Sequence, residues 1–357
     1  MVDTIIQNIQ TKLASLYGID QSKALLDRIL ALIPQQTDND RDILSVNEHD
    51  VMLIAYGDHI QRPGEPPLRT LGAFLDRYTD GLIPCVHLLP FYPFTSDDGF
   101  SVVDYYAINP ALGTWDDVRA LGQKYRLMYD AVFNHISSKS RWFEGFKQQI
   151  SPYRDYFVVV DPDVDLSQVV RPRTLPLLTP IETSSGIKHV WTTFSADQID
   201  LNVMNPEVLL ELLKALLFYV QQGAQFIRLD AIAFMWKEVG TSCIHLPQTH
   251  LIIQLMRDVL DLCMPDTILI TETNVPHQEN VSYFGDGTNE AQMVYNFALP
   301  PLIYHTMLTG DATELSSWAA ALKQPGDQAT FFNFTASHDG IGVRPIAAIL
   351  SDTQVSY

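Results

Sequence analysis

Acidic, amide and imidazole side chains follow several short apolar segments of this sequence. They are Asp130, Asn134, His135, Asp230, Glu272, His338 and Asp339. Such side chains act as nucleophiles, as general acids or bases, and as hydrogen-bonding partners of hydroxyl groups. Two carboxyl groups in one pocket can transfer a glycosyl group with retention: one attacks the anomeric carbon, and the other donates a proton to the leaving oxygen. We expect Asp230 and Glu272 to be that pair.

Three further side chains would support this chemistry. Arg228 precedes Asp230 by two positions, so both side chains point to the same face of a strand, and its charge would keep the nucleophile ionised. Asp339 would place negative charge near the cationic transition state, and His338 would bind sugar hydroxyls. Each residue alone has a structural explanation, such as an ion pair for Arg228 and Asp230 or a core position for His135. Their joint occurrence after successive strands favours the functional interpretation.

Strands that alternate with helices must position these side chains. Strands are expected at 51–56, 83–89, 127–133, 225–230, 267–272, 293–297 and 330–334, and helices near 67–79, 115–123, 206–222, 248–263 and 301–322. The helix at 206–222 has the clearest signals, with Asn205 as N-cap, Pro206 in its first position and Gly223 after its end. Strand–helix alternation predicts a parallel sheet with right-handed crossovers. In a parallel α/β barrel, the loops after the strands converge on the face where active sites form.

The chain divides into three parts by pattern. Residues 1–49 carry apolar residues at helical spacing and are expected to form an N-terminal helical extension. Residues 50–136 and 195–357 carry the alternating strands and helices of the predicted barrel. Residues 137–194 contain several prolines and little periodicity, so we interpret them as an insertion after the third strand. Because seven strands are found where a barrel needs eight, we expect an incomplete (β/α)8 barrel.

Composition narrows the possible partners. The 357 residues carry a formal net charge of −19, which disfavours nucleic acid and anionic membranes as partners. No segment is long and apolar enough for a membrane span, and the N-terminus does not resemble a signal peptide. The three cysteines, Cys85, Cys243 and Cys263, lack the spacing of a disulfide framework or a zinc site. We expect a cytoplasmic protein.

Four segments carry a family resemblance. They are DAVFNH at 130–135, FIRLDA at 226–231, TETN at 271–274 and SHDG at 337–340. In order and approximate spacing they resemble the signature regions of the alpha-amylase family of glycoside hydrolases, family 13. The resemblance implies that Asp230 is the nucleophile, Glu272 the acid/base and Asp339 the transition-state stabiliser. It also implies that the sugar is bound by His135, Arg228 and His338, and that 137–194 corresponds to the inserted domain B.

Further segments resemble the sucrose phosphorylase subfamily. They are HLLPFYPFTSDDGF at 87–100, RPR at 171–173, KEVGTSC at 237–243 and NFALPPL at 296–302. This resemblance implies that Asp97 binds glucose hydroxyls, that Phe100 lies against the sugar and that Arg173 helps to bind phosphate. A guanidinium group suits phosphate, although an arginine in a proline-rich loop can equally be a solvated surface residue.

Some positions depart from the sucrose-specific pattern. Tyr105 and Tyr106 stand where sucrose phosphorylases usually carry a histidine, and Asn274 also replaces a histidine. The sequence looks more similar to the glucosylglycerate phosphorylases of the subfamily. The implied reaction transfers glucose from an α-glucoside, through a covalent aspartyl intermediate, to inorganic phosphate. It gives α-glucose 1-phosphate, with glycerate or fructose as leaving group and phosphate as co-substrate, and it needs no cofactor.

Alternatives remain open at this point. A hydrolase or transglucosidase of the same family would share the first chemical step, and a non-catalytic amylase-like protein would use the fold for binding alone. Family members continue beyond SHDG through an eighth strand and a small β domain, so we expect the chain to be a C-terminally truncated fragment with little or no activity. Asn134 corresponds to a calcium ligand in many amylases, but the DPDVD segment at 161–165 is a poor binding loop. We therefore expect no metal site, and the oligomeric state stays open.

Overall fold

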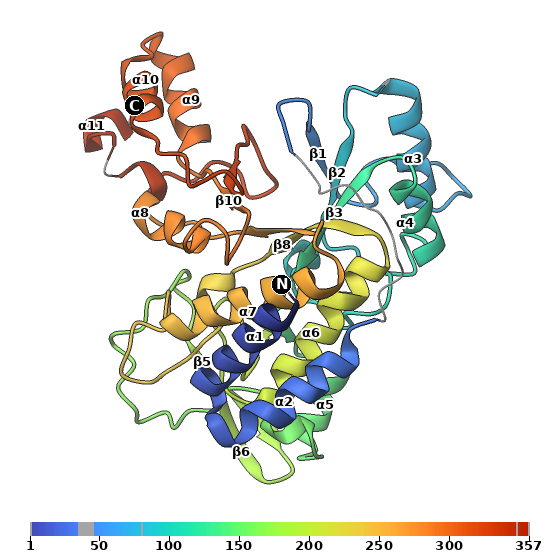
Figure 1. Cartoon of the computed structure of the whole chain (residues 1–357), viewed down its shortest axis with the longest axis vertical. Helices are drawn as coiled ribbons and strands as arrows, with labels where there is room; N and C mark the ends of the chain where they lie inside the picture. Colours follow the sequence, from blue (N-terminus) through green and yellow to red (C-terminus); the bar gives the residue numbers. More distant parts are fainter. Residues whose placement is uncertain (1, 35–45, 80, 348, 356–357) are drawn as a thin grey trace. The chain divides into compact units, whose positions relative to one another are not determined.

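The computed structural model describes residues 2–34, 46–79, 81–347 and 349–355. The chain forms two compact units, of which the first ends at Thr267 and the second begins at Ile268. Figure 1 shows the path of the chain and the labels of its helices and strands. In the residues that the structure describes, none of the helices combines the length and the hydrophobicity needed to cross a bilayer.

A parallel sheet forms the centre of the first unit. Its strands are β1 (Met52–Ala55), β2 (Cys85–Leu88), β3 (Arg126–Ala131) and β8 (Ala224–Leu229), in the spatial order β1-β2-β3-β8. The register pairs Asp130 of β3 with Arg228 of β8. All four strands run in the same direction, so polar residues at their carboxyl ends lie along one edge of the sheet.

Helices cover this sheet between the strands. They are α3 (Pro67–Tyr78), α4 (Trp115–Gly122), α6 (Pro206–Gln221) and α7 (Pro247–Cys263). The predicted start of α6 is confirmed, because the side chain of Asn205 accepts a hydrogen bond from the Glu207 amide and Pro206 occupies the first turn. The other three helices match their predicted ranges to within a few residues.

Two helices precede the sheet, as the apolar spacing predicted. They are α1 (Val2–Tyr17) and α2 (Ile19–Leu32). Figure 1 shows α1 beside α7 and α2 beside α6. Ile9 and Leu13 of α1 are fully buried, and the hydroxyl of Tyr17 donates to the carbonyl of Val203 at 2.7 Å. The apolar faces of both helices therefore pack against the rest of the first unit.

The segment after β3 has more regular structure than its proline content suggested. It contains β4 (His135–Ser137), α5 (Arg141–Lys147), the 3₁₀ helix η2 (Tyr153–Asp155), β5 (Leu178–Thr183), β6 (Gly186–Trp191) and β7 (Gln198–Asp200). The strands β5 and β6 form an antiparallel hairpin, and β4 pairs antiparallel with β7. The tight turn of the hairpin uses Gly186 at φ 104°, a conformation that favours glycine. The β4–β7 pair places Asp200 opposite His135 and Gln198 opposite Ser137.

The second unit holds the last three predicted strands. They are β9 (Ile268–Thr271), β10 (Met293–Tyr295) and β11 (Thr330–Phe332), which pair in parallel in this order. Its helices are α8 (His277–Asn280), α9 (Leu299–Thr309), α10 (Thr313–Ala321) and α11 (Asp352–Val355), with the 3₁₀ helices η4 (Val281–Phe284) and η5 (Arg344–Ile346). All seven predicted strands are thus present, and the predicted α/β class with parallel strands is confirmed.

The predicted length of one helix in the second unit is wrong. The single helix expected at 301–322 is two helices, α9 and α10. Gly310 ends α9 in the left-handed region at φ 72°, and the side chain of Asp311 accepts a hydrogen bond from the amide of Thr313 at 2.9 Å. A left-handed glycine followed by an aspartate that holds the next turn is a helix stop and restart.

Candidate active site

A network of buried charges joins three neighbouring strands of the first unit. Nη1 of Arg228 donates to Oδ1 of Asp130 at 2.6 Å and to Oδ1 of Asp230 at 2.7 Å. Nε2 of His87, on β2, lies 2.7 Å from Oδ2 of Asp130. All four side chains are buried. Buried charges are tolerated when they are paired and hydrogen-bonded, so the arginine holds one oxygen of each carboxylate in a fixed position.

The electrostatics of this network keep Asp130 ionised. Burial by itself raises the pKa of Asp130, but the charges of His87 and Arg228 and hydrogen bonds from both outweigh it, and the net pKa is lowered. The arginine is therefore shared between two carboxylates rather than paired with one. Asp130 therefore helps to fix the guanidinium group of Arg228, which in turn holds the carboxylate of Asp230.

The backbone next to Asp230 is strained. Ala231 has a φ of 49°, in the left-handed region, and it starts the 3₁₀ helix η3 (Ile232–Phe234). A residue other than glycine in this region costs about 1–3 kcal/mol and persists only where the surroundings fix it. Such conformations gather at functional sites, so the strain agrees with a functional role for the end of β8.

The residues predicted to bind the sugar gather around Gln198. Nε2 of Gln198 donates to Oδ2 of Asp97 at 2.8 Å, and Nε2 of His135 lies 2.8 Å from the carbonyl oxygen of Phe100. The guanidinium carbon of Arg228 lies 5.5 Å from the centre of the Phe100 ring. The first unit therefore brings Asp97, Phe100, His135, Arg228 and Asp230 into one region.

The protonation of His135 follows from its partners. A carbonyl oxygen can only accept, so Nε2 of His135 carries the proton that it donates to Phe100. Its Nδ1 then accepts from the side-chain amide of Asn134, at 3.2 Å. Burial lowers the pKa of His135 despite the opposing charge of Asp200. The ring is therefore neutral at pH 7, and its Nε2 is already engaged by the protein.

A lysine that the sequence did not single out lies behind His135. Nζ of Lys237 donates to Oδ1 of Asn134 at 2.6 Å and lies 2.6 Å from Oδ2 of Asp200. Asp200 also accepts from the amide and the hydroxyl of Thr193. Burial lowers the pKa of Lys237, while Asp200 opposes this shift. In many amylases, the corresponding asparagine is a calcium ligand. Here the side-chain oxygen of Asn134 instead accepts a hydrogen bond from the ammonium group of Lys237.

Metal ligands are not gathered anywhere in the described ranges. Among those residues, no group of three or more His, Cys, Asp or Glu side chains is arranged to hold a metal ion. The absence of a metal from the reaction nevertheless stays a prediction, as does the absence of a cofactor.

The remaining predicted catalytic residues belong to the second unit. Glu272 directly follows β9 and is partly buried, whereas Asp339 is exposed in the loop after β11. Nε2 of His338 lies 3.4 Å from Oδ2 of Asp339. Each of these residues follows a strand of the parallel group β9-β10-β11, in agreement with the expected positions.

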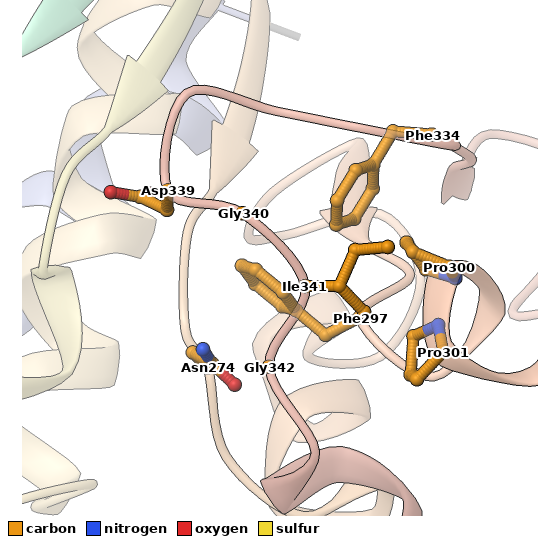
Figure 2. A pocket seen from close by; sticks show the side chains of 9 residues that line it. All are labelled: Asn274, Phe297, Pro300, Pro301, Phe334, Asp339, Gly340, Ile341 and Gly342. Atoms are coloured by element: carbon orange, nitrogen blue, oxygen red, sulfur yellow. The ribbon is translucent and has the colours of Figure 1, made fainter. Parts of the chain in front are cut away.

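A pocket of the second unit lies beside Asp339. Figure 2 shows its lining residues, which are Asn274, Phe297, Pro300, Pro301, Phe334, Asp339, Gly340, Ile341 and Gly342. Aromatic, proline and isoleucine side chains form its apolar part, and Asn274 and Asp339 supply the polar groups. A Cβ atom at Gly342 would lie 3.1 Å from Nδ2 of Asn274, so the glycine allows the loop to approach the amide closely.

Two other sequence expectations can be placed. Arg173 lies in the exposed loop 171–176 of the insertion, so its role in binding phosphate stays a prediction. Tyr105 is buried, and its hydroxyl donates to the carbonyls of Val132 at 2.9 Å and His135 at 3.0 Å. This tyrosine therefore supports the backbone around His135.

Comparison with known proteins gives a consistent result. A sequence model described as "Alpha amylase, catalytic domain" matches residues 78–341. The chain is 54% identical to the glucosylglycerate phosphorylase of Allomeiothermus silvanus over 353 residues, covering 98% of this chain and 63% of that protein. It is 50% identical to the glucosylglycerate phosphorylase of Escherichia coli, covering 87% of this chain and 56% of that protein.

More distant relatives include a sucrose phosphorylase and a solved structure. The sucrose phosphorylase of Agrobacterium vitis is 33% identical, covering 84% of this chain and 61% of that protein. The crystal structure of sucrose 6F-phosphate phosphorylase from Thermoanaerobacter thermosaccharolyticum matches with a TM-score of 0.77 at 24% identity, covering 87% of this chain and 64% of that one. This structural match concerns the fold alone. The chain spans between 56% and 63% of the length of the three curated relatives named.

Proposed function

Since the chain belongs to the alpha-amylase family, we propose that it carries the catalytic residues of a retaining α-glucoside phosphorylase. The observation that carries this proposal is the placement of Asp230. Its carboxylate is held by Arg228 at the carboxyl end of β8, in the same region as Asp97, Phe100 and His135. The similarity to glucosylglycerate and sucrose phosphorylases supports phosphate as the acceptor.

In the first step, Asp230 attacks the anomeric carbon of the α-glucoside. The bond from that carbon to the leaving oxygen breaks, and protonated Glu272 donates its proton to this oxygen. The product is a β-linked glucosyl ester of Asp230. Asp339 stabilises the positive charge that develops on the sugar in the transition state.

In the second step, an oxygen of inorganic phosphate attacks the anomeric carbon of the ester, and the proton of the phosphate passes to the carboxylate of Glu272, which is then ready for the next cycle. The carboxylate of Asp230 leaves, and α-glucose 1-phosphate forms with the original configuration after two inversions. Arg173 contributes to phosphate binding. Asp97, Arg228 and His338 hold the glucosyl group by hydrogen bonds, and Phe100 lies against its ring. His135 binds a sugar hydroxyl when its Nε2 exchanges the Phe100 carbonyl for that hydroxyl.

Membership of the alpha-amylase family also supports an assignment of the parts of the chain. We assign the seven strands to an incomplete (β/α)8 barrel, residues 137–194 to domain B and residues 1–49 to an N-terminal extension. The three cysteines are free and buried, which supports a reducing compartment such as the cytoplasm. The partners in this proposal are an α-glucoside and phosphate.

The leaving group in this proposal is glycerate rather than fructose. Higher identity to glucosylglycerate phosphorylases supports this choice, and Asn274 places an amide donor in the pocket beside Asp339. An amide can donate to the carboxylate of glycerate. In protein made from the complete gene, we expect phosphorolysis of glucosylglycerate to exceed that of sucrose and of glucosylglycerol at least tenfold in kcat/KM, measured as glucose 1-phosphate. Faster phosphorolysis of sucrose would overturn this assignment.

Arg173→Ala is expected to weaken phosphate binding and spare the first step. A charge-assisted hydrogen bond contributes about 1.5–3 kcal/mol, so the KM for phosphate should rise roughly tenfold or more. The glucosyl-enzyme then has longer to react with water, and free glucose should increase relative to glucose 1-phosphate. Arg171→Ala, in the same exposed loop, is the matched control. An equal rise of the KM for phosphate in both variants would show that Arg173 is a solvated surface residue without a specific role in phosphate binding.

A hydrolase or transglucosidase is the second candidate, because the first step is the same in all three reactions. Product analysis with and without phosphate separates them. Glucose release that phosphate does not suppress would favour the hydrolase, and transfer to a second sugar would favour the transglucosidase. No turnover of any α-glucoside would favour an inactive protein.

A further inference from the structure

The carboxylate of Asp197 is surrounded by hydroxyl groups. Its Oδ2 accepts hydrogen bonds from Thr95 at 2.5 Å, Ser96 at 2.5 Å and Ser101 at 2.8 Å. Its Oδ1 accepts from Ser138 at 2.5 Å. Burial raises the pKa of Asp197, but these four hydroxyl groups outweigh it and the net pKa is lowered. Asp197 is therefore ionised at pH 7, and its carboxylate accepts hydrogen bonds from two separate segments of the chain.

The hydroxyl groups belong to two segments that both carry predicted sugar-binding residues. Thr95, Ser96 and Ser101 border the loop that contains Asp97 and Phe100, while Ser138 follows β4 and His135. The backbone strengthens the second connection, because the amide of Ser138 donates to the carbonyl of Asp197 at 2.8 Å. Asp197 thus ties the loop 95–101 to the end of β4.

The loop 95–101 needs such a connection, because its backbone is strained. Asp97 and Asp98 both lie in the left-handed region, at φ 55° and 48°. Gly99 follows at φ 107°, where an added Cβ would lie 2.8 Å from the carbonyl oxygen of Pro90. Non-glycine residues keep this conformation only when surrounding contacts fix it. The hydroxyl groups at both ends of the loop supply contacts of that kind.

The neighbour of Asp197 holds the same loop from inside. Gln198 is buried, and its Nε2 donates to Oδ2 of Asp97 at 2.8 Å. Its Oε1 accepts from the hydroxyl of Ser195 at 2.9 Å, which fixes the orientation of the amide. Asp197 therefore holds the two ends of the loop 95–101, and Gln198, the first residue of β7, holds the carboxylate of Asp97 within it.

We propose that Asp197 is a positioning residue for glucosyl binding. It acts by fixing the loop 95–101, so that Asp97 and Phe100 face the sugar at the correct distance. The inference rests on the proposed function, because it takes Asp97 and Phe100 as sugar-binding residues. It goes beyond that function by naming the residue that organises them.

The test compares Asp197→Ala with Asp197→Asn in protein made from the complete gene. The alanine variant loses every hydroxyl contact, and we expect its kcat/KM for the glucosyl donor to fall about 30- to 100-fold. The asparagine variant keeps one oxygen acceptor and can donate to a hydroxyl from its amide, so it should recover at least half of the loss on a logarithmic scale. Asp165→Ala, at an exposed aspartate in the insertion, is the control and should change kcat/KM less than twofold.

A double-mutant cycle separates positioning from a general structural role. If Asp197 acts through Asp97, then Asp197→Ala should lower kcat/KM less than threefold in the Asp97→Ala background, because coupled residues are not additive. An equal fold-loss in both backgrounds would overturn the proposal, as would a loss that follows only the melting temperature.

Hydrogen exchange provides a readout that does not depend on activity. We expect the amides of 95–101 to exchange at least tenfold faster in Asp197→Ala, with unchanged exchange in α6. Unchanged exchange in 95–101 would overturn the proposal even if the protein turned over no glucoside. If the alanine variant does not fold, Ser138→Ala tests the same contact with the loss of one hydroxyl, and the same two outcomes apply. Wild-type protein that releases no glucose 1-phosphate would count against the proposed function alone.

Discussion

Asp230→Asn is expected to lower phosphorolysis by roughly 10⁴-fold or more, because removal of a nucleophile from a catalytic group has effects of that order. An amide does not attack the anomeric carbon as a carboxylate does. The substitution should leave the fold intact, since the amide oxygen can still accept from Arg228, which remains paired with Asp130. Intact-protein mass spectrometry after mixing with α-glucosyl fluoride should show a glucosyl adduct in the wild type without phosphate and none in the variant.

Glu272→Gln is the informative comparison for this variant. The amide cannot donate a proton to a poor leaving group, but fluoride needs little protonation. We therefore expect Glu272→Gln to react with α-glucosyl fluoride far better than with glucosylglycerate, whereas Asp230→Asn should lose both reactions. A glucosyl adduct on Asp230→Asn would assign the nucleophile to another residue. Equal losses on both substrates in Glu272→Gln would assign the acid elsewhere.

Two sequence features predicted part of this site: the alternation of side chains along a strand and the positions at which the strands end. Arg228 and Asp230 are two residues apart, so strand alternation alone places them on one face, and the hydrogen bond between them confirms it. The seven strands were found because buried parallel strands are continuous apolar segments. The start of α6 was found because Asn205 and Pro206 are local signals.

Contacts between distant segments could not be predicted in this way. Gln198 and Asp97 are 101 positions apart, and their contact depends on the antiparallel pairing of β4 with β7, which no local pattern announced. Lys237 and Asp200 belong to segments whose apolar residues gave no reason to expect a buried charge between them. Residues 310–312 separate α9 from α10, and Gly310 was the one among them that indicates a helix end.

Lys237→Met is expected to destabilise the first unit by about 3–5 kcal/mol, the usual cost of breaking a buried ion pair from one side. Methionine fills a similar volume, but it leaves the fully buried carboxylate of Asp200 without the ammonium group 2.6 Å away. The hydrogen bonds from Thr193 remain, but hydroxyl and amide donors do not supply a positive charge. The loss would be a large share of a typical net stability of about 5–15 kcal/mol.

Urea unfolding followed by tryptophan fluorescence measures this loss. Four of the five tryptophans, Trp115, Trp142, Trp191 and Trp236, belong to the first unit, so the signal mainly reports its unfolding. Lys214→Met, which removes a partly exposed pair with Glu211, should cost no more than about 1 kcal/mol. Adding Asp200→Asn to Lys237→Met removes the unpaired charge and should restore part of the stability, because a neutral amide is far less costly to bury than an unpaired carboxylate. A Lys237→Met protein as stable as the Lys214→Met control would mean that the buried ammonium group contributes nothing to folding.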